Sequence, residues 1–331
     1  MEIQFTKISQ FIINAKENAY RSINTELIKL YWQTGNYISK KLSNSEWGAS
    51  VVDKLAEFIQ IKHPEMKGFS RRGLYRMKQF YDTYKNNEKV SSLLTQITWT
   101  NHLLILSKAK SIEEKEFYIL LTSKEKYASR ELERQFKSGY YERHVLSNIK
   151  VSAVPTQIDN EIFSKFKDTY VMEFLQLPDI YEEKDLQRSI LRNMKRFILE
   201  FGRDFTFVGE EYRVQVGNSD YYIDLLFYHR ELRCLVAVEL KTIDFQPEHL
   251  GKMNFYLEAL DREYKKSYEN PSVGIIICKG KNDEVVEFAL SRNVSPTMIA
   301  KYETNLIDKK ILEYKLHELY KSATVCRRNI L

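Results

Sequence analysis

Residues 221–241 read YYIDLLFYHRELRCLVAVELK and decide the fold of the second half of the chain. Two apolar runs, residues 221–228 and 233–241, flank a short polar link at residues 229–232. Short runs rich in aromatic and aliphatic residues around such a link predict two strands joined as a hairpin.

Three charged residues stand inside these apolar runs. A symmetric hairpin centred between residues 231 and 232 places Asp224 directly opposite Glu239, where opposed Cβ atoms lie about 4.5–5.5 Å apart. Side chains alternate along a strand, so Lys241 lies on the same face as Glu239. Two carboxylates at that range repel unless a cation neutralises them, and Mg²⁺ binds one or two carboxylates together with waters and phosphates. The pattern predicts metal-assisted phosphoryl chemistry with Mg²⁺ or Mn²⁺, in which Lys241 positions water or stabilises transition-state charge.

A simpler interpretation is that Lys241 only pairs with one carboxylate at a sheet surface. The apolar residues 225–227 and 235–238 argue against it, because buried strands seldom hold three charges without a function.

Length and periodicity predict two domains within the 331 residues. Helical spacing fills the first half, and strand-like runs begin after residue 200. A helix at 183–201, strands at 205–216, 221–228 and 233–241, a helix at 248–266, a buried strand at 273–278 and a helix at 282–291 give the order αβββαβα. We expect a helical domain at 1–150, a connector at 151–178 and an α/β domain at 179–331.

Charge is unevenly divided between these halves. The net charge is +6, but residues 1–150 carry +9 and residues 151–331 carry −3. Basic surfaces favour phosphate backbones, although a solvated helical surface is the alternative. The chain has no signal-peptide pattern and no run long enough to span a membrane, so we expect a cytoplasmic protein without a membrane partner or an organic cofactor. Three cysteines without CxxC spacing predict neither a disulfide framework nor a zinc site.

The element order, with Asp224 followed by Glu239-x-Lys241, resembles the PD-(D/E)XK nuclease superfamily. Longer stretches are similar to its bacterial YhcG-like family. In the second half these are FTFVG (205–209), YIDLLFYH (222–229), LRCLV (232–236), ELK (239–241) and MNFYL (253–257). In the first half they are YWQTG (31–35), MKGFSRR (66–72), WTNHL (99–103) and SREL (129–132).

This resemblance implies an α+β protein, with an all-α winged-helix-like N-terminal domain followed by an α/β restriction-endonuclease-like (αβββαβ) domain. It implies metal-dependent hydrolysis of DNA phosphodiesters in recombination, repair or defence against foreign DNA. Asp224 and Glu239 are then metal ligands, and Lys241 is the catalytic lysine.

The chain departs from the family pattern at two places near this triad. Many members carry an acidic residue where Gln187 stands, and Glu183 or Asp185 would have to replace it. Related proteins often have glutamine where Lys252 stands, and Lys252 would either touch a phosphate or be solvated. Tyr256 is a further accessory candidate.

Residues 49–85 read as helix, turn, helix, with basic and aromatic residues at the start of the second helix. Such a helix suits phosphate contact or entry into a DNA groove, and the nucleic-acid-binding candidates are Arg71, Arg72, Tyr75, Arg76 and Lys78. The alternative is an exposed amphipathic helix. We expect a second basic set, Arg130, Arg134, Lys137, Arg143 and Lys150, to be solvated surface.

Other interpretations stay open. The chain could be a non-catalytic nucleic-acid-binding or adaptor protein on a degenerate nuclease fold, or it could cleave RNA at the same site. A homodimer is compatible with cutting both DNA strands. We expect His102 to be structural, and His229 and His249 to flank the proposed site.

Overall fold

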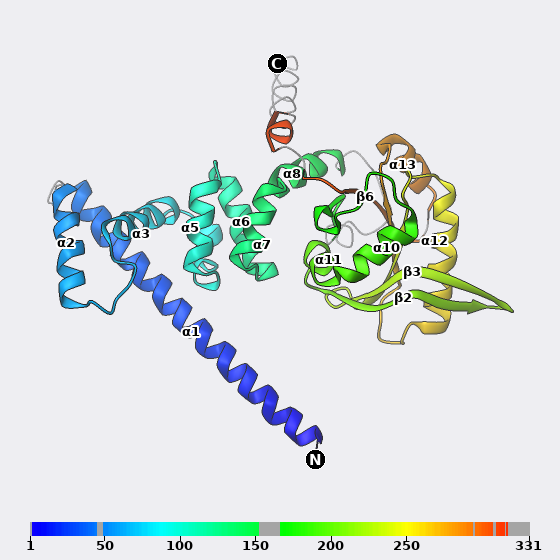
Figure 1. Ribbon diagram of the computed structural model, residues 1–331, viewed down its shortest axis with the longest axis horizontal. Helices are drawn as coiled ribbons and strands as arrows, with labels where there is room; N and C mark the ends of the chain where they lie inside the picture. Colours follow the sequence, from blue (N-terminus) through cyan, green and yellow to red (C-terminus); the bar gives the residue numbers. More distant parts are fainter. Residues whose placement is uncertain are drawn as a thin grey trace. The chain divides into compact units, whose positions relative to one another are not determined.

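The computed structural model describes residues 2–44, 49–151, 166–293, 295–306, 309–314 and 316. The chain divides into two compact units, Met1–Phe136 and Lys137–Leu331, which are described separately (Figure 1). Among the described residues, no helix has both the length and the apolar content needed to cross a membrane.

The first unit is helical throughout its described part. Its elements are α1 (Glu2–Ser43), α2 (Ala49–Lys62), α3 (Arg71–Tyr84), α4 (Glu88–Ser91), the 3-10 turn η1 (Leu94–Gln96), α5 (Trp99–Lys108), α6 (Ile112–Glu125) and α7 (Ser129–Lys137). Ser70 and Ser111 cap α3 and α6, since their hydroxyls accept hydrogen bonds from the backbone of Gly73 and Glu114. The all-α character is confirmed, and the closer likeness to a winged helix stays a prediction.

The core of this unit is an aromatic cluster around Phe80, which is fully buried. Its ring contacts those of Trp32, Tyr84, Trp99 and His102 at centroid distances of 4.7–5.6 Å. His102 is also buried, and its Nε2 lies 2.8 Å from the carbonyl of Leu94. Burial lowers the pKa of His102 to about 4, so it is a neutral structural histidine, as expected.

The second unit is built on one mixed sheet. Its strands are β1 (Thr169–Val171), β2 (Phe205–Val216), β3 (Ser219–His229), β4 (Cys234–Leu240), β5 (Val273–Cys278) and β6 (Thr297–Glu303). They lie in the order β1-β6-β5-β4-β3-β2. Strands β1, β6, β5 and β4 pair in parallel with one another, and β4, β3 and β2 pair antiparallel.

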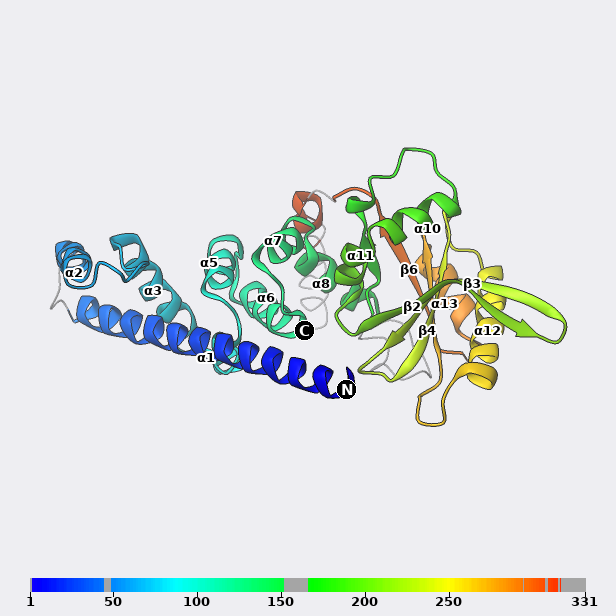
Figure 2. The same ribbon diagram turned by 60° about the horizontal axis from the view of Figure 1, so that its bottom comes forward.

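Helices cover both faces of this sheet (Figure 2). One face packs against α10 (Glu183–Arg192) and α11 (Met194–Phe201), through Leu186, Ile190, Phe197 and Phe201. The other packs against α12 (Glu248–Ala259), through Leu250, Met253, Tyr256 and Leu257. The remaining elements are α8 (Tyr140–Val151), the 3-10 turn η2 (Glu173–Leu175), a π-helical turn η3 (Leu260–Tyr264) and α13 (Asp283–Leu290). A helical unit and a mixed α/β unit confirm the α+β class.

The helix α12 approaches the sheet unusually closely at Gly274 of β5. A Cβ atom at this position would lie 2.6 Å from Met253 Cγ and 3.2 Å from Thr297 Oγ1. Distances under 3.0 Å force neighbours to move, so a larger residue here would displace the Met253 side chain.

Three expectations need correction. The single helix predicted at 183–201 is two helices, because the backbone leaves helical geometry at Asn193. The predicted connector includes strand β1, which with three residues has too few positions to show alternation. The seven-residue strand β6 was not foreseen either. Arg143 is buried rather than solvated, since its guanidinium donates to the carbonyls of Ser138 and Thr169.

The aromatic cluster generates a stability prediction. Phe80→Ala should reduce the free energy of unfolding of the first unit by about 3–5 kcal/mol, because the cavity removes ring contacts on several sides. All three tryptophans of the chain lie in the first 100 residues, so tryptophan fluorescence during urea unfolding reports on this unit. Phe58→Ala, at a side chain 57% exposed, is the control and should change little. Equal effects of the two changes would contradict the assignment of the core.

Candidate active site

The register of β3 and β4 sets the geometry of the site. The strands pair antiparallel with Leu225 opposite Val238 and Phe227 opposite Val236. This is the register predicted from a hairpin centred between residues 231 and 232, and it is confirmed. The next position along both strands brings Asp224 of β3 level with Glu239 of β4.

Lys241 follows directly after β4 and stays in line with the sheet. Its backbone N–H donates to the carbonyl of Ile277 at 2.8 Å, which continues the pairing with β5. Its Nζ lies 3.1 Å from Glu239 Oε1, so the two side chains share one face, as strand alternation predicts.

Asp224 is held by the backbone of the neighbouring strand. Its Oδ2 accepts a hydrogen bond from the N–H of Leu240 at 2.8 Å. Burial, reinforced by the nearby carboxylate of Glu239, raises the pKa of Asp224 to about 6.

Glu239 is the most buried charge in this region, with 1% of its side chain exposed. Its Oε1 contacts two ammonium groups, Lys241 at 3.1 Å and Lys252 at 2.5 Å. Its Oε2 is buried and has no hydrogen-bond partner among the described residues. An unpaired buried carboxylate oxygen is costly, so it marks a place where a cation or a donor would be stabilising.

The helix α10 contributes two further side chains. Glu183 accepts a hydrogen bond from Lys241 Nζ at 3.0 Å, and Gln187 donates its amide to the carbonyl of Asp224 at 3.1 Å. Asp185 instead caps its own helix, where it accepts from the backbone of Glu182. Of the two acidic residues named as alternatives, the structure therefore brings Glu183 to the triad.

The helix α12 approaches from the opposite face of the sheet and supplies Lys252 and Tyr256. The hydroxyl of Tyr256 donates to the carbonyl of Tyr222 at 2.5 Å, and Lys252 Nζ lies 5.4 Å from the centre of the Tyr256 ring. Lys252 was expected either to touch a phosphate or to be solvated. Its ion pair with Glu239 was not foreseen, because sequence spacing does not show which charge of the sheet a helix residue will meet.

The two flanking histidines have local partners. His229 is buried, and its Nδ1 accepts from the N–H of Leu232 within the β3–β4 turn. His249 stands in the first turn of α12, and its Nδ1 accepts from the backbone of Gln246. Burial, together with the positive charge of Lys241, lowers the pKa of His249 and favours its neutral form.

The basic residues singled out in the first unit lie along α3. Leu74 and Met77 of the same helix are buried in the core. Arg71 is exposed and pairs with Asp53 of α2, and Lys78 pairs with Asp82 one turn later. The remaining candidates are Arg72, which is exposed, and Tyr75 and Arg76, which are half-buried.

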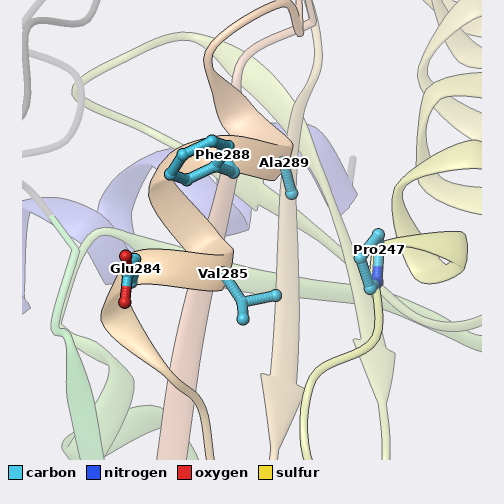
Figure 3. Close-up of a pocket in the computed structure, with 5 residues that line it drawn as sticks. All are labelled: Pro247, Glu284, Val285, Phe288 and Ala289. Atoms are coloured by element: carbon cyan, nitrogen blue, oxygen red, sulfur yellow. The ribbon is translucent and has the colours of Figure 1, made fainter.

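The second unit has a pocket of about 480 Å³ that does not involve Asp224, Glu239 or Lys241 (Figure 3). It is lined by Pro247 before α12 and by Glu284, Val285, Phe288 and Ala289 of α13. None of the triad side chains lines it, so it is not part of the candidate site. Among the described residues, no three His, Cys, Asp or Glu side chains form a complete metal cluster.

Family models match both halves of the chain. Residues 163–317 match the YhcG PDDEXK nuclease domain, and residues 7–143 match the DUF1016 N-terminal domain. The chain joins a YhcG PDDEXK nuclease domain to a DUF1016 N-terminal domain. The nuclease-domain match contains every side chain of the site described above.

One curated relative is similar over nearly the whole length. The protein named "Putative nuclease YhcG" from Escherichia coli (strain K12) is 27% identical over 346 aligned positions, which cover 93% of this chain and 92% of that protein. The resemblance to the YhcG-like nuclease family is thus confirmed.

Two solved structures match smaller parts. A repair endonuclease from Pyrococcus abyssi is 17% identical with a TM-score of 0.27, over 39% of this chain and 50% of that one. EndoMS in its apo form is 15% identical with a TM-score of 0.26, over 39% and 48%. Likeness at these scores carries no argument about the present chain.

Because the pKa of Asp224 is raised, the free energy of unfolding of the YhcG-type nuclease domain should fall as the pH rises. The folded-state pKa of about 6 lies above the unfolded value of about 3.9, so the stability that the carboxyl contributes is present below about pH 4 and is lost as pH rises through 6. Asp224→Asn keeps an acceptor for Leu240 but cannot ionise. In EDTA it should therefore stabilise the domain at pH 8 by about 1–3 kcal/mol and leave it unchanged near pH 4.

Calorimetric melting at both pH values checks this prediction. Asp220→Asn is the matched control, because Asp220 is a partly exposed residue of the same strand, paired with Arg213 at the surface. If Asp224→Asn proves less stable than wild type at pH 8, the carboxylate of Asp224 is well solvated and the raised pKa is wrong.

Proposed function

We propose that this chain is a metal-dependent nuclease that hydrolyses DNA phosphodiester bonds, with Asp224 and Glu239 as metal ligands and Lys241 as the catalytic lysine. The observation that carries the proposal is the convergence of two opposed carboxylates and a buried ammonium on one face of the sheet. The family match supports the reaction class, since both the model and the E. coli relative are named as nucleases.

The donor set fits a divalent cation. Glu239 Oε2 is buried without a protein partner among the described residues. Asp224 accepts the hydrogen bond from the N–H of Leu240 through Oδ2 and not through Oδ1. Two carboxylates are a sufficient protein contribution for Mg²⁺ or Mn²⁺, which fill their remaining positions with waters and phosphate oxygens. When bound, such a cation supplies Lewis-acid polarisation of the phosphate and lowers the pKa of nearby water.

Lys241 is positioned to act on phosphate as a permanent cation. Burial by itself lowers its pKa, but the carboxylates of Glu239 and Glu183 outweigh this effect and raise the pKa above its usual value. Only 12% of the side chain is exposed, so water screens its charge weakly. A protonated ammonium fixed in this way can orient a water molecule and stabilise the charge that develops on phosphate oxygens.

Glu183 and Gln187 act as positioning residues in this proposal. Glu183 gives the Lys241 ammonium a second carboxylate besides Glu239, and Gln187 ties α10 to the backbone of Asp224. Tyr256 fixes α12 against the β3 carbonyl at Tyr222. None of these groups needs to change its protonation during hydrolysis.

In this proposal the first unit binds the nucleic acid. Its net positive charge and the arginines at the start of α3 suit a phosphate backbone. We place the activity in recombination, repair or defence against foreign DNA. The described residues hold one such site, and a homodimer would bring two of them together to cut both strands.

The catalytic assignment is tested with a double variant, Glu239→Ala/Lys241→Ala. Wild type should cut DNA with Mg²⁺ or Mn²⁺ and not with EDTA, and the variant should lose at least about 100-fold in rate, since it lacks both a metal ligand and the phosphate-facing cation. Gel assays use supercoiled, linear and single-stranded DNA, with RNA as a competing substrate. Glu258→Gln/Arg262→Ala removes an exposed ion pair at the end of α12 and is the matched control.

The outcomes separate the alternatives. Cutting of RNA in preference to DNA would replace the substrate while keeping the site. Absence of cutting by any protein, with retardation of DNA by all of them, would identify a nucleic-acid-binding protein on a silenced nuclease fold.

The role of α3 gives an independent prediction. Arg72→Ala/Arg76→Ala should weaken DNA binding about uniformly across sequences and reduce the slope of log affinity against log salt by about 1–2. Fluorescence anisotropy at 50–300 mM salt, roughly the range over which phosphate contacts dominate, measures both quantities. Lys7→Ala/Lys16→Ala removes the same charge from exposed positions of α1; an equal effect of this control would show that only net charge matters.

A further inference from the structure

Two ammonium groups share one oxygen of Glu239. Lys252 Nζ lies 2.5 Å from Oε1, and Lys241 Nζ lies 3.1 Å from the same atom. The other oxygen, Oε2, has no hydrogen-bond partner among the described residues. The shortest ion pair of the site is therefore made by a residue outside the Asp-Glu-Lys triad.

The two lysines are held very differently. Lys241 is fixed between Glu239 and Glu183, and 12% of its side chain is exposed. Lys252 reaches Glu239 from the surface of α12, and 46% of its side chain is exposed. The ammonium of Lys252 can thus leave Glu239 by rotating about its own side-chain bonds, without disturbing the core.

A second neighbour of the Lys252 ammonium lies on the same helix. Tyr256 is one helical turn further along α12, and its ring centre is 5.4 Å from Lys252 Nζ. The ring is anchored through its hydroxyl to the Tyr222 carbonyl, and a cation near an aromatic face at this range is attracted to it. The lysine therefore keeps a favourable neighbour when its contact with Glu239 is lost.

The charges around Glu239 indicate which of its two ion pairs, with Lys241 or with Lys252, breaks when a cation binds. Glu183, Asp224 and Glu239 supply three negative charges, and the two lysines already supply two positive ones. A divalent cation next to Glu239 would repel both ammonium groups. Lys241 keeps a second carboxylate in Glu183, whereas the described residues give Lys252 an ion pair with Glu239 alone. Lys252 is therefore the group that moves.

We propose that Lys252 is a built-in counter-cation of the active site, which pairs with Glu239 in competition with the metal ion and turns to the phosphate of the substrate once the metal has displaced it. This inference rests on the proposed metal-dependent nuclease function and adds a control on it. The positive charge of Lys252 thus raises the concentration of divalent cation needed to fill the site.

The test measures Mn²⁺ binding to the full-length protein without DNA, by calorimetry or by the electron paramagnetic resonance of free Mn²⁺. Lys252→Gln and Lys252→Met remove the charge, and the methionine keeps an unbranched side chain that can pack against α12. Both should bind Mn²⁺ about tenfold more tightly than wild type, as expected for loss of a directly coupled competitor. Glu239→Gln should abolish this binding in every background.

Lys184→Gln is the matched control. Lys184 is exposed beside Glu183 in the first turn of α10, and removing its charge changes the net charge equally without breaking a contact to Glu239. Its Mn²⁺ affinity should stay within about twofold of wild type, because an exposed charge is screened by salt.

Thermal melting gives a second readout. In EDTA, Lys252→Gln should lower the melting temperature of the nuclease domain by about 2–4 °C, because buried Glu239 loses its nearest cation. Added Mn²⁺ should raise the melting temperature of this variant more than that of wild type. If Lys252 has only a packing role, the variant should melt at a lower temperature in EDTA, and Mn²⁺ should not raise its melting temperature more than that of wild type. That result would overturn the inference.

The failure of this inference differs from failure of the proposed function. Wild-type binding that depends on Glu239, with equal or weaker binding by both Lys252 variants, would overturn the role of Lys252 and leave the metal site standing. Absence of Mn²⁺ binding from wild type and from both variants would remove the metal site itself, and the counter-cation role with it.

Discussion

The second unit depends on one constraint, the register that sets Asp224 level with Glu239 inside an apolar sheet. Two carboxylates so close together repel each other, and the two nearby ammonium groups reduce this repulsion. Lys241 continues the strand, Glu183 steadies Lys241 from α10, and Lys252 reaches over from α12. The buried strands exclude water and so prevent solvent from screening the repulsion. Hydrophobic packing on both faces of the sheet therefore holds these charged groups close together.

Much of this arrangement could be predicted because it is local in sequence. Strand alternation places Lys241 beside Glu239, and hairpin symmetry fixes the register of Asp224; both rules operate within about twenty residues. The remaining features depend on contacts between distant segments. Nothing in the spacing showed that Lys252 would meet Glu239, or that Arg143 would be buried against the start of β1. The choice between Glu183 and Asp185 depended on helix capping, because the capping residue directs its side chain back toward the backbone.

The two units divide the requirements of a nuclease between separate folds. The helical unit carries the excess positive charge and a rigid aromatic core, and it contains no site of the Asp-Glu-Lys type in its described part. The sheet unit is slightly acidic overall, yet it gathers ammonium groups at the point where we place the chemistry. Such a division lets affinity for a phosphate backbone be adjusted on one unit without altering the electrostatic balance around Glu239 on the other.

The glycine at position 274 extends this dependence to a residue that carries no functional group. The Met253 side chain of α12 fills the space where a Cβ at this position would stand. Lys252 precedes Met253 in the chain, so a substitution at position 274 that shifts the backbone of α12 would also shift Lys252. In a genetic screen, a substitution at position 274 that moves α12 in this way would resemble the loss of an active-site residue.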